Sequence, residues 1–153
     1  MKITEIQVKL MDDDSWSNER LRGFASVVFD GEFVVRDLKI IEGTKGLFVA
    51  MPTRKLTDRC NHCGTKNHLR SRYCNQCGSR LGPDRAERDE LGRANLHADV
   101  THPINAACRE KIQKAVLAAY GEEMRLSMLP GYTPRRDEFG ADRDIVTPTS
   151  VRY

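Results

Sequence analysis

The stretch Phe24-Ala-Ser-Val-Val-Phe-Asp-Gly-Glu-Phe-Val-Val35 decides the fold, because it holds two apolar runs separated by Asp30-Gly31. An Asp-Gly pair between such runs is a strong hairpin signal, since a type I′ turn needs positive φ at both central residues. We therefore predict a strand over residues 21–29, a tight turn at Asp30-Gly31, and a third strand that ends near Ile41.

The neighbouring segments extend this hairpin into a sheet. Residues 2–11 alternate, with Ile6, Val8 and Leu10 on one face, and this period of two is typical of a half-buried strand. After a five-residue loop at 42–46, residues 47–51 form a fourth apolar run that Pro52 ends. The first third of the chain is therefore predicted to be an antiparallel meander of four strands.

One helix is predicted after the string His102-Pro-Ile-Asn105. Apolar residues then recur at helical spacing: Cys108, Ile112, Ala115, Val116 and Ala119. Asn105 is a suitable N-cap, and Gly121 is the expected stop. A helix on one face of a small sheet predicts an α+β fold, with four to five antiparallel strands and one packed C-terminal helix.

Four of the five cysteines form a duplicated motif within residues 57–82. Cys60-Asn-His-Cys63-Gly and Cys74-Asn-Gln-Cys77-Gly are near-copies of one turn, separated by ten residues. Four thiolates in two C-x-x-C turns suit tetrahedral zinc, and a glycine after each pair lets the backbone turn with positive φ. We predict an inserted zinc ribbon that binds one structural zinc ion through Cys60, Cys63, Cys74 and Cys77.

Other chemistry for these residues is less favoured. Duplicated pairs without a surrounding βαβ pattern argue against a thioredoxin-like redox motif, and a reducing compartment argues against disulfides. His62 and His68 are interpreted as exposed loop histidines, because four thiolates complete a zinc site. Cys108 lies on the apolar stripe of the helix and is interpreted as a small buried hydrophobe.

Composition narrows the class of protein. The 153 residues are 31% charged with a mean hydropathy of −0.56, and they contain no apolar run long enough for a spanning helix. The first residues reach Asp12-Asp-Asp14 without an apolar segment, so we expect no signal peptide and a cytoplasmic location. Three adjacent acids there are interpreted as a solvated loop.

The basic excess is local, although the net charge is only +3. Residues 57–82 hold five basic side chains and one acidic side chain, and residues 101–120 hold three basic side chains and one acidic side chain. Around Tyr73 the basic side chains suit phosphate contact and base stacking. Alternatively, they offset the net charge of minus two on a four-thiolate zinc centre.

Two strings in the sheet and helix resemble a known family. Gly46-Leu-Phe-Val-Ala-Met-Pro52 and His102-Pro-Ile-Asn105 are similar to the signatures of the stage V sporulation protein G family, also called the septation proteins. The resemblance covers residues 1–56 and 97–120. It implies a bacterial cytoplasmic regulator that dimerises and binds DNA or RNA, whereas family members normally connect these two strings by a shorter segment.

These observations predict a domain layout. We expect an α+β core formed by residues 1–56 and 97–121, the zinc ribbon at 57–82, a charged linker at 83–96 and a flexible tail at 122–153. The edge strand at 47–51 is expected to pair with its copy in a homodimer.

The predicted function is nucleic-acid binding. The candidate contact residues come from the end of the fourth strand, the ribbon and the helix: Arg54, Lys55, Arg59, Arg70, Arg72, Arg109, Lys111 and Lys114. If the loop between the cysteine pairs is extended, Arg70 and Arg72 share one side. The alternative is a protein-interaction adaptor that uses the ribbon or the tail. No catalytic motif was found, so no enzymatic activity is expected.

Overall fold

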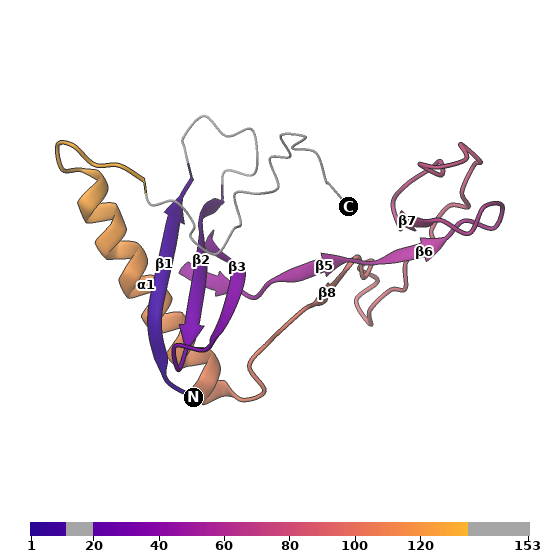
Figure 1. Cartoon of the computed structure of the whole chain (residues 1–153). Coiled ribbons are helices and arrows are strands. Elements are labelled where there is room, and N and C mark those ends of the chain that lie inside the picture. The colour runs from indigo at the N-terminus through magenta and orange to yellow at the C-terminus, as the bar shows by residue number, and fades with distance from the viewer. Residues whose placement is uncertain (12–19, 135–153) are drawn as a thin grey trace. The chain divides into compact units, whose positions relative to one another are not determined.

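The computed structural model describes residues 1–11 and 20–134. The chain forms two compact units (Figure 1). The core unit consists of Met1–Pro52 together with the chain from Thr101 onward, and the cysteine unit is Thr53–Val100. In the part of the chain that is described, no helix is long and apolar enough to cross a membrane.

The core unit contains the predicted four-stranded antiparallel meander, with the strands in the order β1-β2-β3-β4. Its strands are β1 (Ile3–Leu10), β2 (Leu21–Phe29), β3 (Phe33–Gly43) and β4 (Gly46–Ala50). At the first hairpin, Asp30 and Gly31 have φ values of 53° and 68°. The N–H of Glu32 donates to the carbonyl of Phe29 over 3.0 Å, as a tight turn requires.

The second hairpin is tighter than the sequence suggested. A five-residue loop over residues 42–46 was predicted, but Gly43 pairs with Gly46 and leaves a turn of two residues, Thr44 and Lys45. Gly46 has a φ of 111°, which permits this turn. Strand β3 is therefore longer than predicted and extends beyond Ile41 to Gly43.

The helix α1 (Ala106–Ser127) begins where it was predicted and ends later. The side chain of Asn105 accepts a hydrogen bond from the N–H of Cys108 over 2.8 Å and so caps the helix. The predicted stop at Gly121 is wrong, since Gly121 lies inside the helix and its φ is not positive. Residues 122–127 of the tail predicted for 122–153 are thus helical, and residues 135–153 lie outside the described residues.

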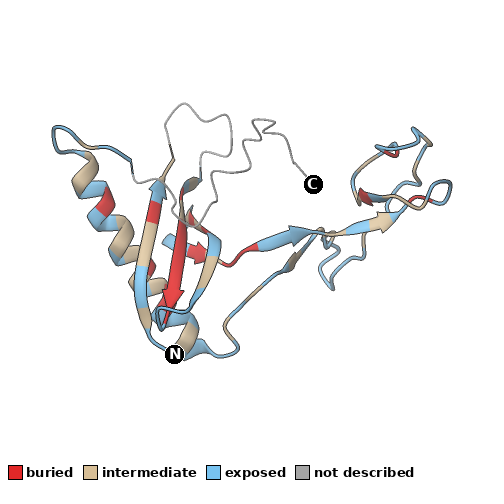
Figure 2. Cartoon of the chain, viewed as in Figure 1, coloured by how far each residue is buried: buried red, intermediate tan, exposed pale blue. Residues whose placement is uncertain are grey.

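The core lies between α1 and one face of the sheet. Its most completely buried side chains are Val27, Leu38, Ile40 and Val116. Figure 2 shows buried residues concentrated along β2. Cys108 is partly buried against this core, which agrees with its interpretation as a small hydrophobe. The expected α+β fold is confirmed.

The cysteine unit has little regular structure. Strand β5 (Thr53–Lys55) pairs with β8 (His97–Asp99), and β6 (Thr57–Arg59) pairs with β7 (Lys66–His68). Because β5 and β8 pair with each other, they belong to this unit, whereas the sequence placed residues 53–56 and 97–100 with the core. Within residues 53–100, all of which are described, the buried residues are Cys60, Asn67 and Cys74.

Candidate metal centre and basic surface

The two C-x-x-C turns have the same backbone geometry. In the first, the N–H of Gly64 donates to the carbonyl of Cys60 over 2.9 Å. In the second, the N–H of Gly78 donates to the carbonyl of Cys74 over 3.0 Å. Gly64 and Gly78 have φ values of 76° and 75°, which a side chain would strain. The glycine after each pair is therefore required by the turn, as the sequence indicated.

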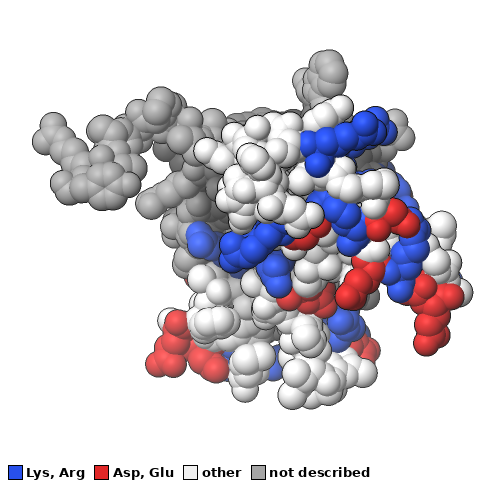
Figure 3. Space-filling view, turned by 90° about the vertical axis from the view of Figure 1, so that its right-hand side faces the viewer, with Lys and Arg blue, Asp and Glu red and all other residues white. Residues whose placement is uncertain are grey.

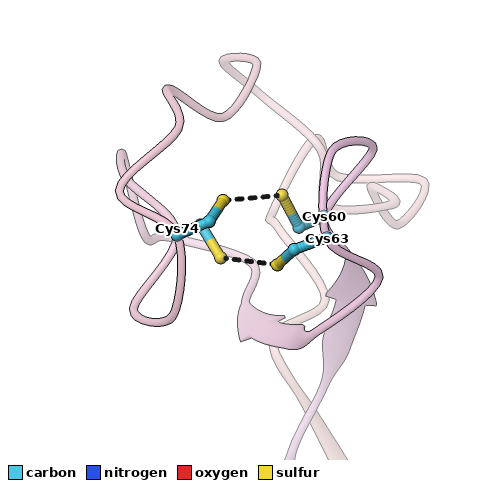
Figure 4. Close-up of side chains that lie close together, drawn as sticks. Cys60, Cys63 and Cys74 are labelled. Atoms are coloured by element: carbon cyan, nitrogen blue, oxygen red, sulfur yellow. Dashed lines mark hydrogen bonds between the residues drawn. The ribbon is translucent and has the colours of Figure 1, made fainter.

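The four sulfur atoms face one another across a small gap (Figure 4). The Sγ atoms of Cys60 and Cys77 are 3.8 Å apart, and those of Cys63 and Cys74 are 3.5 Å apart. All four lie within 4.8 Å of one another. A tetrahedron whose corners lie about 2.3 Å from a zinc ion has edges of about 3.8 Å. The four cysteines can therefore hold a metal ion with little rearrangement.

Local hydrogen bonds favour thiolates in this cluster. The backbone N–H of Cys77, followed by the side chain of Asn67 and the N–H of Gln76, lowers the pKa of Cys74 to about 5. The Ser79 hydroxyl, 3.1 Å from the sulfur of Cys77, lowers the pKa of Cys77.

Cys60 differs from these two cysteines. The N–H of Cys63 favours its thiolate, but burial and the neighbouring sulfurs raise the pKa of Cys60 overall. This is expected where several thiols lie together, because each thiolate disfavours the next until a cation neutralises them.

Asn67 joins the two turns and was not identified from the sequence. It is 3% exposed, and its side-chain oxygen accepts from the N–H of Asn75 over 3.0 Å. Its amide nitrogen donates to the carbonyl of Thr65 over 3.2 Å. One side chain therefore fixes the second cysteine turn against the residues that follow the first.

Arg85 holds the loop between the turns, and nothing in the sequence distinguished it from its charged neighbours. Its guanidinium forms an ion pair with Asp58. It also donates to three carbonyls on one loop, those of His68, Leu69 and Ser71, at 3.2, 3.3 and 2.6 Å. The Arg85 side chain is 15% exposed, so these bonds are shielded from solvent.

The two histidines are not part of the cysteine cluster. His62 is exposed, as predicted. The interpretation of His68 as exposed is wrong: it is half-buried, and its Nδ1 accepts from the N–H of Arg70 over 3.2 Å. That bond helps form a turn at residues 68–71, where the N–H of Ser71 also donates to the carbonyl of His68. The loop that presents Arg70 and Arg72 is thus turned and not extended.

The arginines of the cysteine unit fall into two groups. One group is ion-paired: Arg85 with Asp58, Arg88 with Asp84 and Arg93 with Asp89. Other exposed basic side chains have no carboxylate partner among the described residues: Arg54, Lys55, Arg59, Lys66, Arg70, Arg72 and Arg80. Figure 3 shows exposed Lys and Arg side chains gathered in a broken band, with acidic side chains beside it. Five of these seven cations lie within residues 57–82, the segment that carries the four cysteines, and the other two lie on β5.

The predicted contact residues divide between the units. Arg54 and Lys55 lie on β5, Arg59 lies on β6 and donates to the carbonyl of Gly64 over 3.2 Å, and Arg70 and Arg72 lie on the loop. Those on α1 belong to the core unit.

The two lysines on α1 are already engaged within the core unit. Lys111 donates to the carbonyl of Met1 over 2.7 Å, and Lys114 pairs with Glu110 over 2.8 Å. Of the three predicted contact residues on α1, Lys114 has a carboxylate partner among the described residues, whereas Arg109 and Lys111 do not.

Comparison with known proteins identifies the family. The SpoVG family model matches residues 1–122, which span the sheet, the cysteine unit and most of α1. The chain belongs to the SpoVG family. It is similar to the "Putative septation protein SpoVG" of Finegoldia magna, with 36% identity over 123 residues covering 80% of this chain and 77% of that protein.

Other SpoVG proteins are similar to the same extent. The protein of the same name from Clostridium beijerinckii is 31% identical over 131 residues, covering 86% of this chain and the whole of that protein. "Putative septation protein SpoVG 1" of Listeria monocytogenes is 32% identical over 120 residues, covering 78% of each chain. The resemblance seen in the two sequence strings is thus confirmed.

Proposed function

We propose that this SpoVG-family chain is a nucleic-acid-binding regulatory protein whose cysteine unit is folded around one zinc ion and adds binding surface. One observation carries the proposal. Residues 53–82 contain seven basic side chains and one acidic side chain, Asp58, which is paired with Arg85 from outside this segment. The seven cations therefore face solvent without a carboxylate partner.

The zinc centre alone does not account for this charge. Four thiolates around one zinc ion carry a net charge of minus two, and the seven cations of residues 53–82 exceed that by five. Across the whole unit, residues 53–100, ten basic and six acidic side chains still leave an excess of two after the metal centre is counted. An uncompensated excess on a small surface attracts polyanions and releases their counterions on binding. The excess supports binding to phosphates over a role limited to balancing the metal centre.

Zinc fits the cluster better than other ions do. Four cysteine sulfurs at tetrahedral spacing are typical of structural zinc, and a closed set of four protein ligands leaves no position for substrate. The metal therefore stabilises the unit and takes no part in a reaction. We accordingly propose a binding protein and not an enzyme.

Dimerisation and location complete the proposal. Strand β4 lies at the edge of the sheet, and its Leu47 and Phe48 are 36% and 38% exposed. An edge strand with exposed apolar side chains can pair with its copy across a two-fold axis. A cytoplasmic homodimer would present two cysteine units to one nucleic acid.

Paired charge-removal variants test the proposed surface. We compare Arg54→Ala/Lys55→Ala and Arg70→Ala/Arg72→Ala with a control double, Arg88→Ala/Arg93→Ala, whose arginines are ion-paired. The salt slope is the steepness with which the logarithm of the binding constant falls against the logarithm of salt concentration. Each lost phosphate contact should lower this slope by about one, so the slope of each test double should fall by about two and that of the control should change little.

Two results would change this view. If both test doubles bind DNA and RNA as the unaltered protein does, the proposed surface is wrong. If only the Arg54/Lys55 double weakens binding, the loop between the cysteine turns is better interpreted as a protein-docking element.

A further inference from the structure

Tyr73 is an exposed aromatic residue next to a zinc ligand, and it takes no part in the zinc site. It is 60% exposed, and it directly precedes Cys74. Its hydroxyl has no hydrogen-bond partner within residues 1–11 and 20–134. Both the ring and the hydroxyl of Tyr73 are therefore accessible to a ligand.

The second cysteine turn fixes the backbone under this ring. The N–H of Cys74 donates to the carbonyl of Ser79 over 2.8 Å, and the N–H of Leu81 donates to the carbonyl of Arg72 over 2.8 Å. These two bonds flank an antiparallel bridge between Tyr73 and Arg80. Tyr73 and Arg80 are therefore a non-hydrogen-bonded pair, the type whose side chains approach most closely.

The pairing determines what stands beside the ring. Directly opposed residues in an antiparallel pair project to the same face, with Cβ atoms about 4.5 to 5.5 Å apart. The side chains of Tyr73 and Arg80 thus leave the backbone on the same face, where one ligand can reach both. Arg80 has no carboxylate partner among the described residues, so its charge is available to a ligand.

A ring beside an unpaired arginine suits one ligand chemistry. The ring offers a flat apolar face to a base, and the guanidinium offers donors to the adjoining phosphate. A base in a duplex already has a neighbour on each face, whereas an unpaired base can stack on an aromatic side chain. The bonds of Arg85 to the carbonyls of His68 and Ser71 fix the backbone that carries Arg70 and Arg72, which reduces the backbone entropy lost on binding.

From this geometry we infer that the cysteine unit binds single-stranded nucleic acid, with an unpaired base stacked on Tyr73 and the adjoining phosphate on Arg80. This inference rests on the proposed function and narrows it to strands with unpaired bases. It assigns stacking to Tyr73 and charge to Arg80, so the two residues have distinguishable effects.

The test compares four probes with the full-length, zinc-loaded protein. The probes are an oligothymidine and an oligouridine of about 12 nucleotides, a duplex of the same length, and an abasic strand of the same length. The variants are Tyr73→Ala, Tyr73→Phe and Arg80→Ala. Phe33→Ala is the control, because Phe33 is 64% exposed and lies in the core unit.

Stacking predicts a distinct pattern. Tyr73→Ala should weaken binding to a base-containing single strand about 5- to 150-fold, the range for one lost base stack, and leave the salt slope unchanged. Its affinity for the abasic strand and the duplex should stay at the unaltered protein's level. Tyr73→Phe should bind normally, since the ring remains, and Arg80→Ala should lower the salt slope on the single strands by about 0.7.

The alternatives give different results. If the unaltered protein binds but Tyr73→Ala matches it on both single strands, the inference is overturned while the proposed function stands. If the unaltered protein binds none of the probes, the proposed function fails as well. Tyr73 dependence with either base-containing single strand, without a matching loss on the abasic strand, supports the inference, and an equal loss on all four probes overturns it. The strand that shows the dependence tells whether DNA or RNA is preferred.

Discussion

Removal of zinc should unfold the cysteine unit and leave the core unit folded. The three buried residues of the cysteine unit, Cys60, Asn67 and Cys74, include no aliphatic side chain. Each fully buried aliphatic side chain would contribute about 1.5–3 kcal/mol, and ordering each residue costs about 1–2 kcal/mol of backbone entropy. The binding of a structural zinc ion supplies about 10–16 kcal/mol of free energy to the folding of a small domain. Without the ion, therefore, the unit has no comparable favourable free energy to offset the entropy lost when its chain is ordered.

The assay is an amide-resolved NMR spectrum of the whole chain before and after chelation, with metal analysis on the same sample. We expect the dispersed signals of residues 53–100 to collapse on chelation and to return when zinc is added. Signals from the sheet and α1 should stay dispersed, because the core around Ile40 and Val116 is formed within the core unit.

Cysteine variants provide the matched control. Cys74→Ser should abolish stoichiometric zinc, whereas Cys108→Ser should leave it unchanged, since Cys108 packs on the core of the other unit. The reasoning would be refuted by a zinc-free sample in which residues 53–100 keep their dispersed signals.

Three further predictions follow from the remaining contacts. Arg85→Ala should weaken zinc affinity about 10- to 100-fold although all four ligands remain, because the substitution leaves Asp58 and three loop carbonyls without their donor. Competition for zinc with a metal-binding dye measures the affinity. Gly121→Ala should stabilise the core unit by about 0.5–1 kcal/mol, because an added Cβ meets nothing within 4 Å; a fall in the thermal midpoint would contradict this. Sedimentation should give twice the 17.4 kDa chain mass at micromolar concentration, and a monomer mass would exclude the proposed dimer.

The sequence predicted those features whose causes are local. The Asp30-Gly31 turn depends on two adjacent residues that tolerate positive φ, and the N-cap of α1 depends on Asn105 and the first helical turn. The cysteine cluster was also predictable, because the spacing within each pair and the following glycine determine its geometry.

Features that depend on distant contacts were missed. Gly121 resembles a helix stop, but later residues prolong the helix: Glu123 is buried and accepts a hydrogen bond from the Tyr132 hydroxyl over 2.5 Å. Arg85 looks like one charge in a polar segment, and its role becomes visible only when the chain brings it to Asp58, 27 positions away. The loop with Arg70 and Arg72 is turned by local bonds to His68, and Arg85 binds three of its carbonyls from outside the loop.

The central claim is that a zinc-supported basic surface binds nucleic acid. The most direct test measures the affinity of the zinc-loaded and zinc-free protein for one oligonucleotide over a range of salt concentrations. We predict that the logarithm of the binding constant falls linearly with the logarithm of salt concentration, and that removing zinc reduces both affinity and slope. Undetectable binding by the zinc-loaded protein, or an identical slope without zinc, would contradict the account.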